Sequence, residues 1–336
     1  MVLHPGILAL LVGSLTVAAM ALYSAWFGVR LLRRWDLSSG SEAQILLERR
    51  TYLVSTMMAY AFGFEMISLF LLIFTAEDLQ RLFVGAMCAA GTFNVNGWGY
   101  PALLLKILTV LLAGLWLVVN HADSRGFDYP LIRGKYALLA AMAPVIAAEA
   151  FCTVAWFSGL KANVITSCCG SLFSADSQGV ASTVASVPAA PAAIAFYGML
   201  AATVAAGVYF LKRGGGAGIV YSALSLASLV VSAIALISLF SLYFYALPTH
   251  HCPFCLLQAE YHYVGYLLYV TLLAGAITGT GGGLFSAIRL PASLEAWLPG
   301  YQKRLTAMSL FFYVLFAAVV TAGVVSSDLI MEYFQP

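Results

Sequence analysis

Residues 101–120, PALLLKILTVLLAGLWLVVN, form an apolar run in which Lys106 is the one charged side chain. An apolar run of about 18 or more residues is long enough to cross the hydrocarbon core of a bilayer as a helix. Seven further runs share this property, so the sequence predicts an all-α polytopic membrane protein. The eight predicted spans are residues 5–29, 51–74, 101–120, 136–157, 191–211, 219–243, 262–285 and 305–325.

The composition of the whole chain agrees with this prediction. Of the 336 residues, 62% are hydrophobic and 9% are charged, and the mean hydropathy is +0.93. Soluble domains carry roughly 25% charged residues, so a water-soluble core is excluded. The formal charge of +2 is small and the basic residues are not clustered. We therefore expect no nucleic-acid partner.

Lysine and arginine residues predict the orientation in the membrane, because cytoplasmic loops are enriched in them. The loops after the first, third, fifth and seventh spans hold thirteen of these residues, against Arg81 and Lys161 in the other loops. Both termini are therefore expected outside, with the protein in a bacterial inner or plasma membrane. The first span precedes its basic residues, unlike a signal peptide, and is expected to be a retained anchor.

All six cysteines fall on or near the predicted extracytoplasmic side. Disulfides form and persist in that compartment, and an even number of cysteines permits pairing. The positions are Cys88 after the second span, Cys152 near the outer end of the fourth, Cys168 and Cys169 in the following loop, and Cys252 and Cys255 at the start of the seventh. This placement indicates thiol chemistry outside the cytoplasm and argues against a carrier that moves electrons across the membrane by thiols alone.

The segment 250–255, HHCPFC, has the most specific local chemistry. Pro253 suits the first position of a helix, which would place Cys252 near a helix N-terminus. The partial positive charge there stabilises a thiolate and lowers the pKa of the thiol, which favours thiol–disulfide exchange. The segment is not Cys-x-x-Cys-His, so haem attachment is not indicated. We therefore expect Cys252 and Cys255 to be a redox-active pair.

Two other interpretations of the cysteines stay open. Cys88 is equally compatible with a static structural bridge, and all the cysteines could form such bridges in a structural or anchoring subunit. Alternatively, His250, His251, Cys252 and Cys255 supply ligands suited to Cu(I) or Zn, which would make the chain a metal-handling membrane protein. The favoured class is a membrane thiol–disulfide oxidoreductase, with a metal expected only in the alternative.

A resemblance to a known family involves the loop between the fourth and fifth spans. Residues 168–174, CCGSLFS, are followed after a Ser-rich stretch by 187–191, VPAAP, and a Gly-containing helix. This resembles the loop of vitamin K epoxide reductase-like proteins, in which a Cys-small-Ser-apolar-apolar-Ser segment precedes a Gly-apolar-Pro segment. The order of parts is similar too, because a Cys-x-x-Cys opens the last helix of that family's core. The resemblance covers about residues 135–285.

The resemblance implies three regions and an electron route. The regions are 1–134 with three spans, 135–288 as a four-helix redox module, and 289–336 with the last span. A thioredoxin-like or other dithiol protein outside the cytoplasm would reduce a loop disulfide. Cys169, paired with Cys168 or Cys152, would then exchange with Cys252, and Cys255 would pass electrons to a membrane quinone. The family usually separates its two loop cysteines, whereas Cys168 and Cys169 are adjacent.

Charged residues within the spans are costly to keep in a bilayer and suggest function. Glu65, Lys106 and Glu149 all lie in the outer halves of their spans. Lys106 could pair with either glutamate, as a structural ion pair or as a relay for the protons that quinone reduction needs. We name Glu149 as a candidate cofactor neighbour, together with Glu260 and His262, which follow Cys255 by one to two turns.

Overall fold

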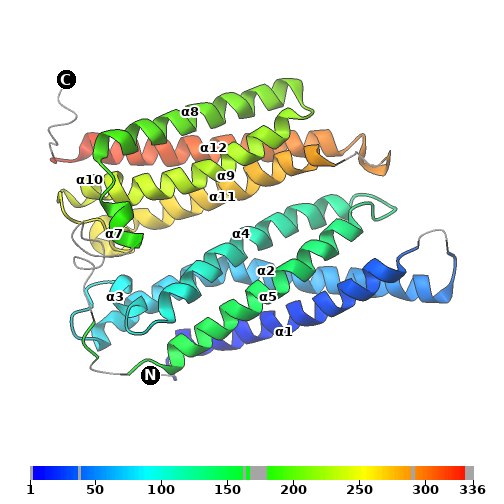
Figure 1. Cartoon of the computed structure of the whole chain (residues 1–336), viewed down its shortest axis with the longest axis horizontal. Coiled ribbons are helices and arrows are strands. Elements are labelled where there is room, and N and C mark those ends of the chain that lie inside the picture. Colours follow the sequence, from blue (N-terminus) through cyan, green and yellow to red (C-terminus); the bar gives the residue numbers. More distant parts are fainter. Residues whose placement is uncertain (1–2, 37–38, 162–163, 167–179, 289–291, 330–336) are drawn as a thin grey trace. The chain divides into compact units, whose positions relative to one another are not determined.

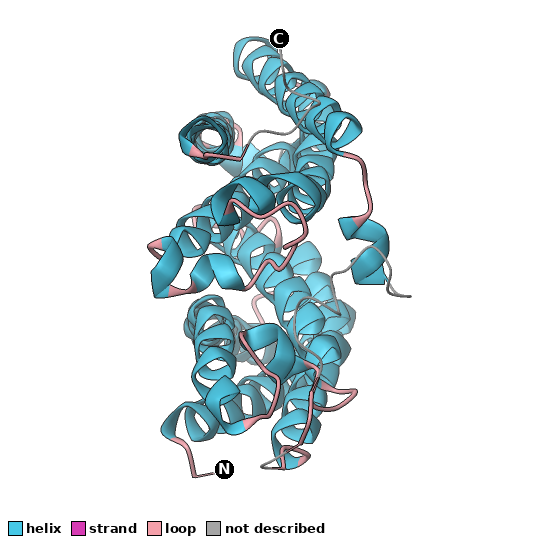
Figure 2. Ribbon diagram, turned by 90° about the vertical axis from the view of Figure 1, so that its left-hand side faces the viewer, coloured by secondary structure: helices cyan, strands magenta, loops and turns pink. Residues whose placement is uncertain are grey.

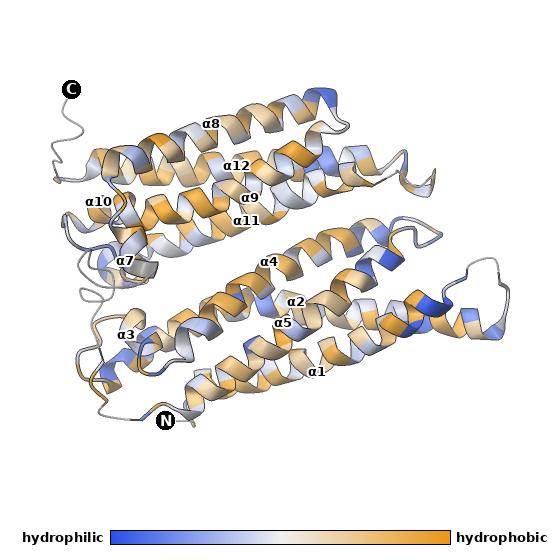
Figure 3. Cartoon of the chain, viewed as in Figure 1, coloured by the Kyte–Doolittle hydropathy of each residue, from blue (hydrophilic) through white to orange (hydrophobic). Residues whose placement is uncertain are grey.

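The computed structural model describes residues 3–36, 39–161, 164–166, 180–288 and 292–329. Figure 2 shows that these residues form helices joined by loops. Within them lie eight helices long and apolar enough to cross a membrane, which confirms the predicted all-α polytopic membrane protein. Hydrophobic residues predominate along the middles of these helices (Figure 3).

The eight spans, which also include the short elements η2 (Leu236–Phe240) and η5 (Phe285–Ala287), are made up mainly of ten labelled elements. They are α1 (Pro5–Arg34), α2 (Glu42–Leu79) with η1 (Gln80–Leu82), α4 (Gly99–Asp123), α5 (Ile132–Ser158), α8 (Ala189–Arg213), α9 (Ala217–Ala235), α10 (Ser241–Tyr245), α11 (Val264–Leu284) and α12 (Leu298–Ser326). A π-helical turn, η2 (Leu236–Phe240), joins α9 to α10. The short elements are α3 (Ala89–Phe93), α7 (Val180–Ala185), η3 (Cys255–Leu257), η4 (Ala259–Tyr261), η5 (Phe285–Ala287) and η6 (Ala292–Leu294).

Local sequence chemistry explains several of the helix ends. Pro5 occupies the start of α1, where a backbone N–H is not needed. The Ser41 side chain caps α2 by accepting a hydrogen bond from the Gln44 N–H. Gly214 ends α8 with a φ of +64°, a conformation that glycine adopts without steric cost. These ends follow from residues adjacent to them in the chain.

The chain divides into two compact units. The first unit contains Met1–Leu82, Thr92–Val164 and Pro291–Leu298, and the second contains Phe83–Gly91, Ile165–Leu290 and Pro299–Pro336. The spanning helices α1, α2, α4 and α5 therefore belong to the first unit. The second unit has α8, α9 with α10, α11 and α12, together with the segment that carries Cys88.

In the first unit, α1 and α4 each pack against both α2 and α5. Large aromatic side chains fill the space between these helices. Phe62 lies edge-on to Trp116 with ring centroids 5.2 Å apart, and Phe27 lies edge-on to Tyr136 at 5.7 Å. All four of these side chains are buried, and they form the centre of the apolar core of this unit.

In the second unit, α9 packs against both α8 and α11, and α12 joins them through hydrogen bonds. The Tyr313 hydroxyl on α12 donates to the Ser225 carbonyl at 2.6 Å, and the Ser309 hydroxyl donates to the Gly275 carbonyl at 2.7 Å. Gly279 permits this close packing, because a Cβ there would lie 2.1 Å from Ser225 Oγ. Small residues and hydroxyl hydrogen bonds are a common means of helix association in membranes.

This division corrects the predicted regions 1–134, 135–288 and 289–336. The fourth span, α5, packs against α1 and α4 in the first unit rather than joining the fifth to seventh spans. Its Glu149 forms an ion pair with Lys106 on α4, which the sequence pattern alone did not assign. The eighth span, α12, instead completes the four-helix arrangement of the second unit.

Candidate functional site: a three-cysteine cluster

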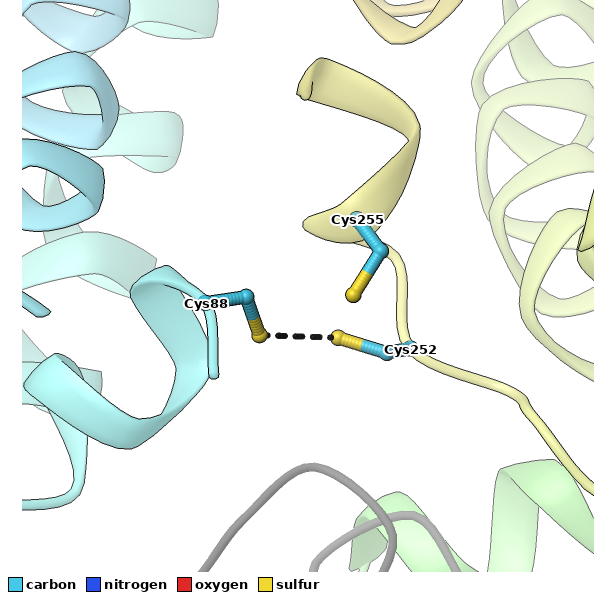
Figure 4. A group of neighbouring side chains, drawn as sticks. All are labelled: Cys88, Cys252 and Cys255. Carbon is cyan, nitrogen blue, oxygen red and sulfur yellow. Dashed lines mark hydrogen bonds between the residues drawn. The ribbon is translucent and has the colours of Figure 1, made fainter. Parts of the chain in front are cut away.

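The sulfur atoms of Cys88, Cys252 and Cys255 lie within 4.8 Å of one another. Cys88 Sγ is 3.5 Å from Cys252 Sγ, farther than the roughly 2.05 Å of a disulfide bond, so these two face each other as thiols. Figure 4 shows the three sulfurs directed into one space. All three residues are buried and belong to the second unit. We refer to these residues as the thiol cluster.

The segment that carries Cys88 is tied to Thr166. The Thr166 N–H donates to the Val84 carbonyl at 2.9 Å, and the Thr166 hydroxyl donates to the Gly91 carbonyl at 2.9 Å. These two bonds lie on either side of Cys88 in the chain. Between them Gly85 turns with a φ of +87°, and a Cβ there would lie 2.6 Å from the Thr166 carbonyl oxygen. Hydrogen bonds from Thr166 therefore fix the backbone both before and after Cys88 in the chain.

Two tyrosines hold the backbone around Cys252. The hydroxyl of Tyr245, at the end of α10, donates to the Cys252 carbonyl. The hydroxyl of Tyr269, on α11, donates to the Pro253 carbonyl at 2.6 Å. These two bonds fix the backbone that follows the Cys252 side chain, which lies outside any regular helix and faces Cys88.

Cys255 begins the single 3₁₀ turn η3, which lies close to the first turn of α11. A Cβ on Gly265 would be 2.9 Å from the carbonyl carbon and oxygen of Leu256, so this approach depends on glycine. Just after the turn, the Gln258 side chain donates to the Met87 carbonyl at 3.2 Å. That bond links the Cys252–Cys255 segment directly to the residue before Cys88.

The prediction that Cys252 and Cys255 open the seventh spanning helix is wrong. Helix α11 begins at Val264, and only the short turn η3 follows Cys252. His262 and Tyr263 have φ values of +53° and +54°, which breaks the helical path before α11 starts. The charge at a helix N-terminus arises from several aligned peptide units. The predicted activation of Cys252 by a helix end therefore does not apply.

The two histidines of the HHCPFC segment face different partners. His250 Nε2 lies 3.3 Å from Cys255 Sγ, whereas His251 Nδ1 lies 3.0 Å from the Ile237 carbonyl in η2. A carbonyl only accepts hydrogen bonds, so His251 Nδ1 carries a proton. Burial lowers the pKa of His251, and nearby His250 lowers it further, while the bond to Ile237 acts in the opposite direction. The neutral form of His251 is therefore favoured at pH 7.

The other predicted site residues lie elsewhere. Cys152 is buried on α5 in the first unit, where Glu149 bonds to Lys106. Cys168 and Cys169 lie outside the described residues, so the exchange between Cys169 and Cys252 stays a prediction. Glu260 and His262 are exposed beside η4. Their role as neighbours of a quinone also stays a prediction.

The contact made by Cys88 is the functional feature that sequence reasoning missed. Its predicted position outside the cytoplasm was the only available signal, because Cys88 and Cys252 are separated by 164 residues. No local motif marks Cys88 as the partner of a Cys-x-x-Cys segment. The choice between Cys88 and the other cysteines required the tertiary structure.

No protein-family model, no curated protein and no solved structure matches this chain. A functional assignment therefore depends on the geometry of the thiol cluster, and the resemblance to vitamin K epoxide reductase-like proteins stays a prediction.

Proposed function

We propose that this protein is a membrane thiol–disulfide oxidoreductase that passes electrons from extracytoplasmic thiols to a membrane quinone. One observation carries the proposal. Cys252 has Cys88 at 3.5 Å between sulfurs and has Cys255 within 4.8 Å. Cys252 therefore has two potential disulfide partners within reach.

Three neighbouring sulfurs are what an internal exchange requires. In thiol–disulfide exchange a thiolate attacks one sulfur of a disulfide, and the other sulfur leaves as a thiolate. A static bridge needs only two cysteines, whereas exchange needs a third sulfur that can attack the bridge. The shared position of Cys252 therefore favours exchange over a structural bridge.

The exchange begins from a Cys252–Cys255 disulfide. The Cys88 thiolate attacks Cys252 Sγ, so that the Cys88–Cys252 bond forms and Cys255 leaves as a thiolate. A thiolate of an external dithiol protein then attacks Cys88 and releases Cys252. The second thiol of that protein resolves the mixed disulfide, which leaves Cys88 as a thiol and the protein partner oxidised.

The Cys252 and Cys255 thiols are then reoxidised to their disulfide. The two electrons and two protons released go to a quinone, which becomes a quinol. The His250 ring nitrogen 3.3 Å from Cys255 Sγ is placed to accept the proton of that thiol. In this scheme Cys88 takes the step that the resemblance assigned to Cys169, whose exchange with Cys252 stays a prediction.

Serine variants of the individual cysteines test the proposal. The purified full-length protein is assayed for quinone-dependent oxidation of a reduced thioredoxin-like protein. We expect turnover to disappear in Cys252→Ser, Cys255→Ser and Cys88→Ser. Ser158→Ala, at an exposed position of the first unit, is the control in the described part of the chain and should retain turnover. Full activity of Cys88→Ser would overturn the proposed role of Cys88.

Disulfide mapping separates exchange from a static bridge. In Cys255→Ser the Cys88–Cys252 disulfide should accumulate, and in Cys88→Ser the Cys252–Cys255 disulfide should replace it. Peptide mass spectrometry after thiol trapping reports both. The native pairs should also titrate at roughly −120 to −270 mV, whereas static bridges titrate below about −300 mV. A single invariant bridge at low potential would contradict the proposal.

A second candidate function is binding of Zn or Cu(I). The specific observation is the set of three sulfurs within 4.8 Å, with His250 Nε2 beside Cys255. In a tetrahedral zinc site, bonds of about 2.3 Å place sulfurs roughly 3.8 Å apart, which this cluster approaches. The ligand set is Cys88, Cys252, Cys255 and His250, so Cys88 replaces the predicted His251.

Metal content distinguishes the two functions. The metal-binding function predicts one Zn or Cu per chain in protein purified without reductant or chelator, measured by elemental analysis. His250→Ala and Cys88→Ser should each lower that content, and His251→Ala should not. Metal-free protein with active quinone-dependent thiol oxidation would exclude the second candidate.

A further inference from the structure

Three of the buried charged residues of the first unit form one group that the proposed thiol chemistry does not use. Lys106 Nζ on α4 lies 2.7 Å from Glu65 Oε2 on α2 and 3.1 Å from Glu149 Oε1 on α5. All three side chains are 0% exposed. We refer to Glu65, Lys106 and Glu149 as the carboxyl–lysine cluster.

The number of charges in this cluster is unbalanced. Two ionised carboxylates and one ammonium group would leave one net negative charge buried among membrane-spanning helices. Such a charge is costly in a low-dielectric interior, and a buried group there neutralises itself by changing its protonation state. One added proton would make the cluster neutral.

Hydroxyl groups bond only one oxygen of each carboxyl group. Ser68 Oγ lies 3.3 Å from Glu65 Oε2, while Thr153 Oγ1 at 2.9 Å and Ser14 Oγ at 3.5 Å lie near Glu149 Oε1. Among the described residues, Glu65 Oε1 and Glu149 Oε2 are buried and have no hydrogen-bond partner. An ionised carboxylate would spread its charge onto such an oxygen, whereas a protonated carboxyl group avoids that cost.

Other titratable groups of these helices are too few or too distant to supply the missing charge. From α1, the group that faces the cluster is the Ser14 hydroxyl. On α5, Cys152 is one turn from Glu149. The charged pairs His4–Asp78 and Lys135–Asp123 lie near helix ends. Within the described residues, the cluster therefore has one cation for two carboxyl groups.

We propose that the carboxyl–lysine cluster is a proton-binding site that holds one proton in addition to the charged Lys106. Glu65, which makes the shorter contact with Lys106, is the carboxylate of the ion pair. Glu149, which makes the longer contact, carries the proton. This site lies on spanning helices of the first unit, whereas the thiol cluster belongs to the second unit.

Infrared spectroscopy of the purified full-length protein at neutral pH counts the protons. A protonated carboxylic acid gives a carbonyl band separate from that of a carboxylate, and the band shifts after exchange into D₂O. We expect the native protein to show one such acid per chain. Glu65→Gln and Glu149→Gln should each abolish the whole band, because either change leaves one carboxylate paired with Lys106. Glu260→Gln, at an exposed position, is the matched control and should leave the band unchanged.

Three outcomes would contradict the proposal that this cluster binds one proton. Absence of the band in native protein would mean that both carboxyl groups are ionised. A band that remains in both single variants would mean that the cluster holds more than one proton or that the band arises elsewhere. Loss of the band in Glu260→Gln would place it outside the cluster. The measurement on the native protein in H₂O and D₂O needs no variant, so it can contradict the proposal even if a variant fails to fold.

Discussion

The two units hold their polar groups in different ways. In the first unit, Glu65 and Glu149 both bond to Lys106, and each of the three residues lies within a long helix. In the second unit, Cys88 and Cys252 lie in non-helical segments, and Cys255 begins a single 3₁₀ turn. Their backbones are held by tyrosine, threonine and glutamine side chains.

This difference matches what each kind of chemistry requires. Buried charges need partners at fixed distances, and a helix provides rigid positions for them. A disulfide must form and break, so that two sulfurs 3.5 Å apart approach to roughly 2.05 Å. Loop segments can make that movement more readily than residues within a packed helix. We therefore expect the stability of the first unit to depend on its buried charges. We expect disulfide formation in the second unit to depend on the backbone conformation around its cysteines.

Lys106→Met should have the largest effect on stability. It leaves two buried carboxyl groups without a cation, and removing one partner of a buried ion pair costs about 3–5 kcal/mol. The loss should be smaller at acid pH, where protonation removes the uncompensated charge. Thermal unfolding of the detergent-solubilised protein measures it, with the exposed Leu104→Met on the same helix as control. Equal stability of the two variants would contradict a charge-dependent first unit.

Gly265→Ala should cause the second-largest loss of stability, because it disturbs packing in the second unit. The new Cβ would lie 2.9 Å from the Leu256 backbone, and overpacking of this kind costs about 1–3 kcal/mol. We also expect slower formation of the Cys252–Cys255 disulfide, because the turn that begins at Cys255 must move. Gly198→Ala, a helical position with open space around its Cβ, is the control. Similar disulfide kinetics in both variants would show that this contact does not position Cys255.

Gly85→Ala should have a smaller effect, confined to the Cys88 segment. Its φ of +87° is unfavourable for alanine by roughly 1–2 kcal/mol, and the Thr166 carbonyl blocks the Cβ. The yield of the Cys88–Cys252 disulfide in Cys255→Ser protein should fall. Gly40→Ala in a loop of the first unit is the control. An unchanged yield would mean that Cys88 is not held by this turn.

His251→Gln should give the smallest effect, visible only in the pH dependence of stability. The pKa of His251 is lower in the folded protein than its unfolded value of about 6.5. The unfolded state therefore binds more protons as the pH falls below that value, and native stability decreases. Unfolding temperatures measured between pH 8 and pH 5 should fall less for His251→Gln than for the native protein. An identical slope would show that His251 does not contribute to this dependence.

Much of the fold could be predicted from local sequence features. The predicted spans 136–157, 191–211 and 262–285 lie within or within two residues of α5, α8 and α11. The predicted span 51–74 was too short, because α2 begins at Glu42 with a charged turn that hydropathy does not detect. The cysteine pair was also expected at the start of the seventh helix, but Cys255–Leu257 and Ala259–Tyr261 form separate 3₁₀ turns before α11 begins at Val264. Hydropathy marks the part of a helix that suits a bilayer, but it does not mark where the helical backbone ends.

The candidate sites were only partly predictable. Sequence reasoning named Cys252 and Cys255 as a redox pair and proposed that Lys106 pairs with a glutamate. It did not identify Cys88 as the third sulfur, nor that Lys106 contacts both glutamates. Each missed contact joins residues on different elements that no local spacing relates. Periodicity describes which face of a helix is apolar, not which helix lies against it.

The amino-acid sequence by itself determined that the chain is an α-helical membrane protein with eight spans, because backbone polar groups in a bilayer must be satisfied within each helix. It also determined which residues carry chemistry, since charges and thiols are conspicuous in an apolar chain. Only the tertiary structure decided the grouping of α5 with the first unit and of α12 with the second. Only it decided that Cys88 meets Cys252, because such contacts depend on how helices far apart in sequence pack.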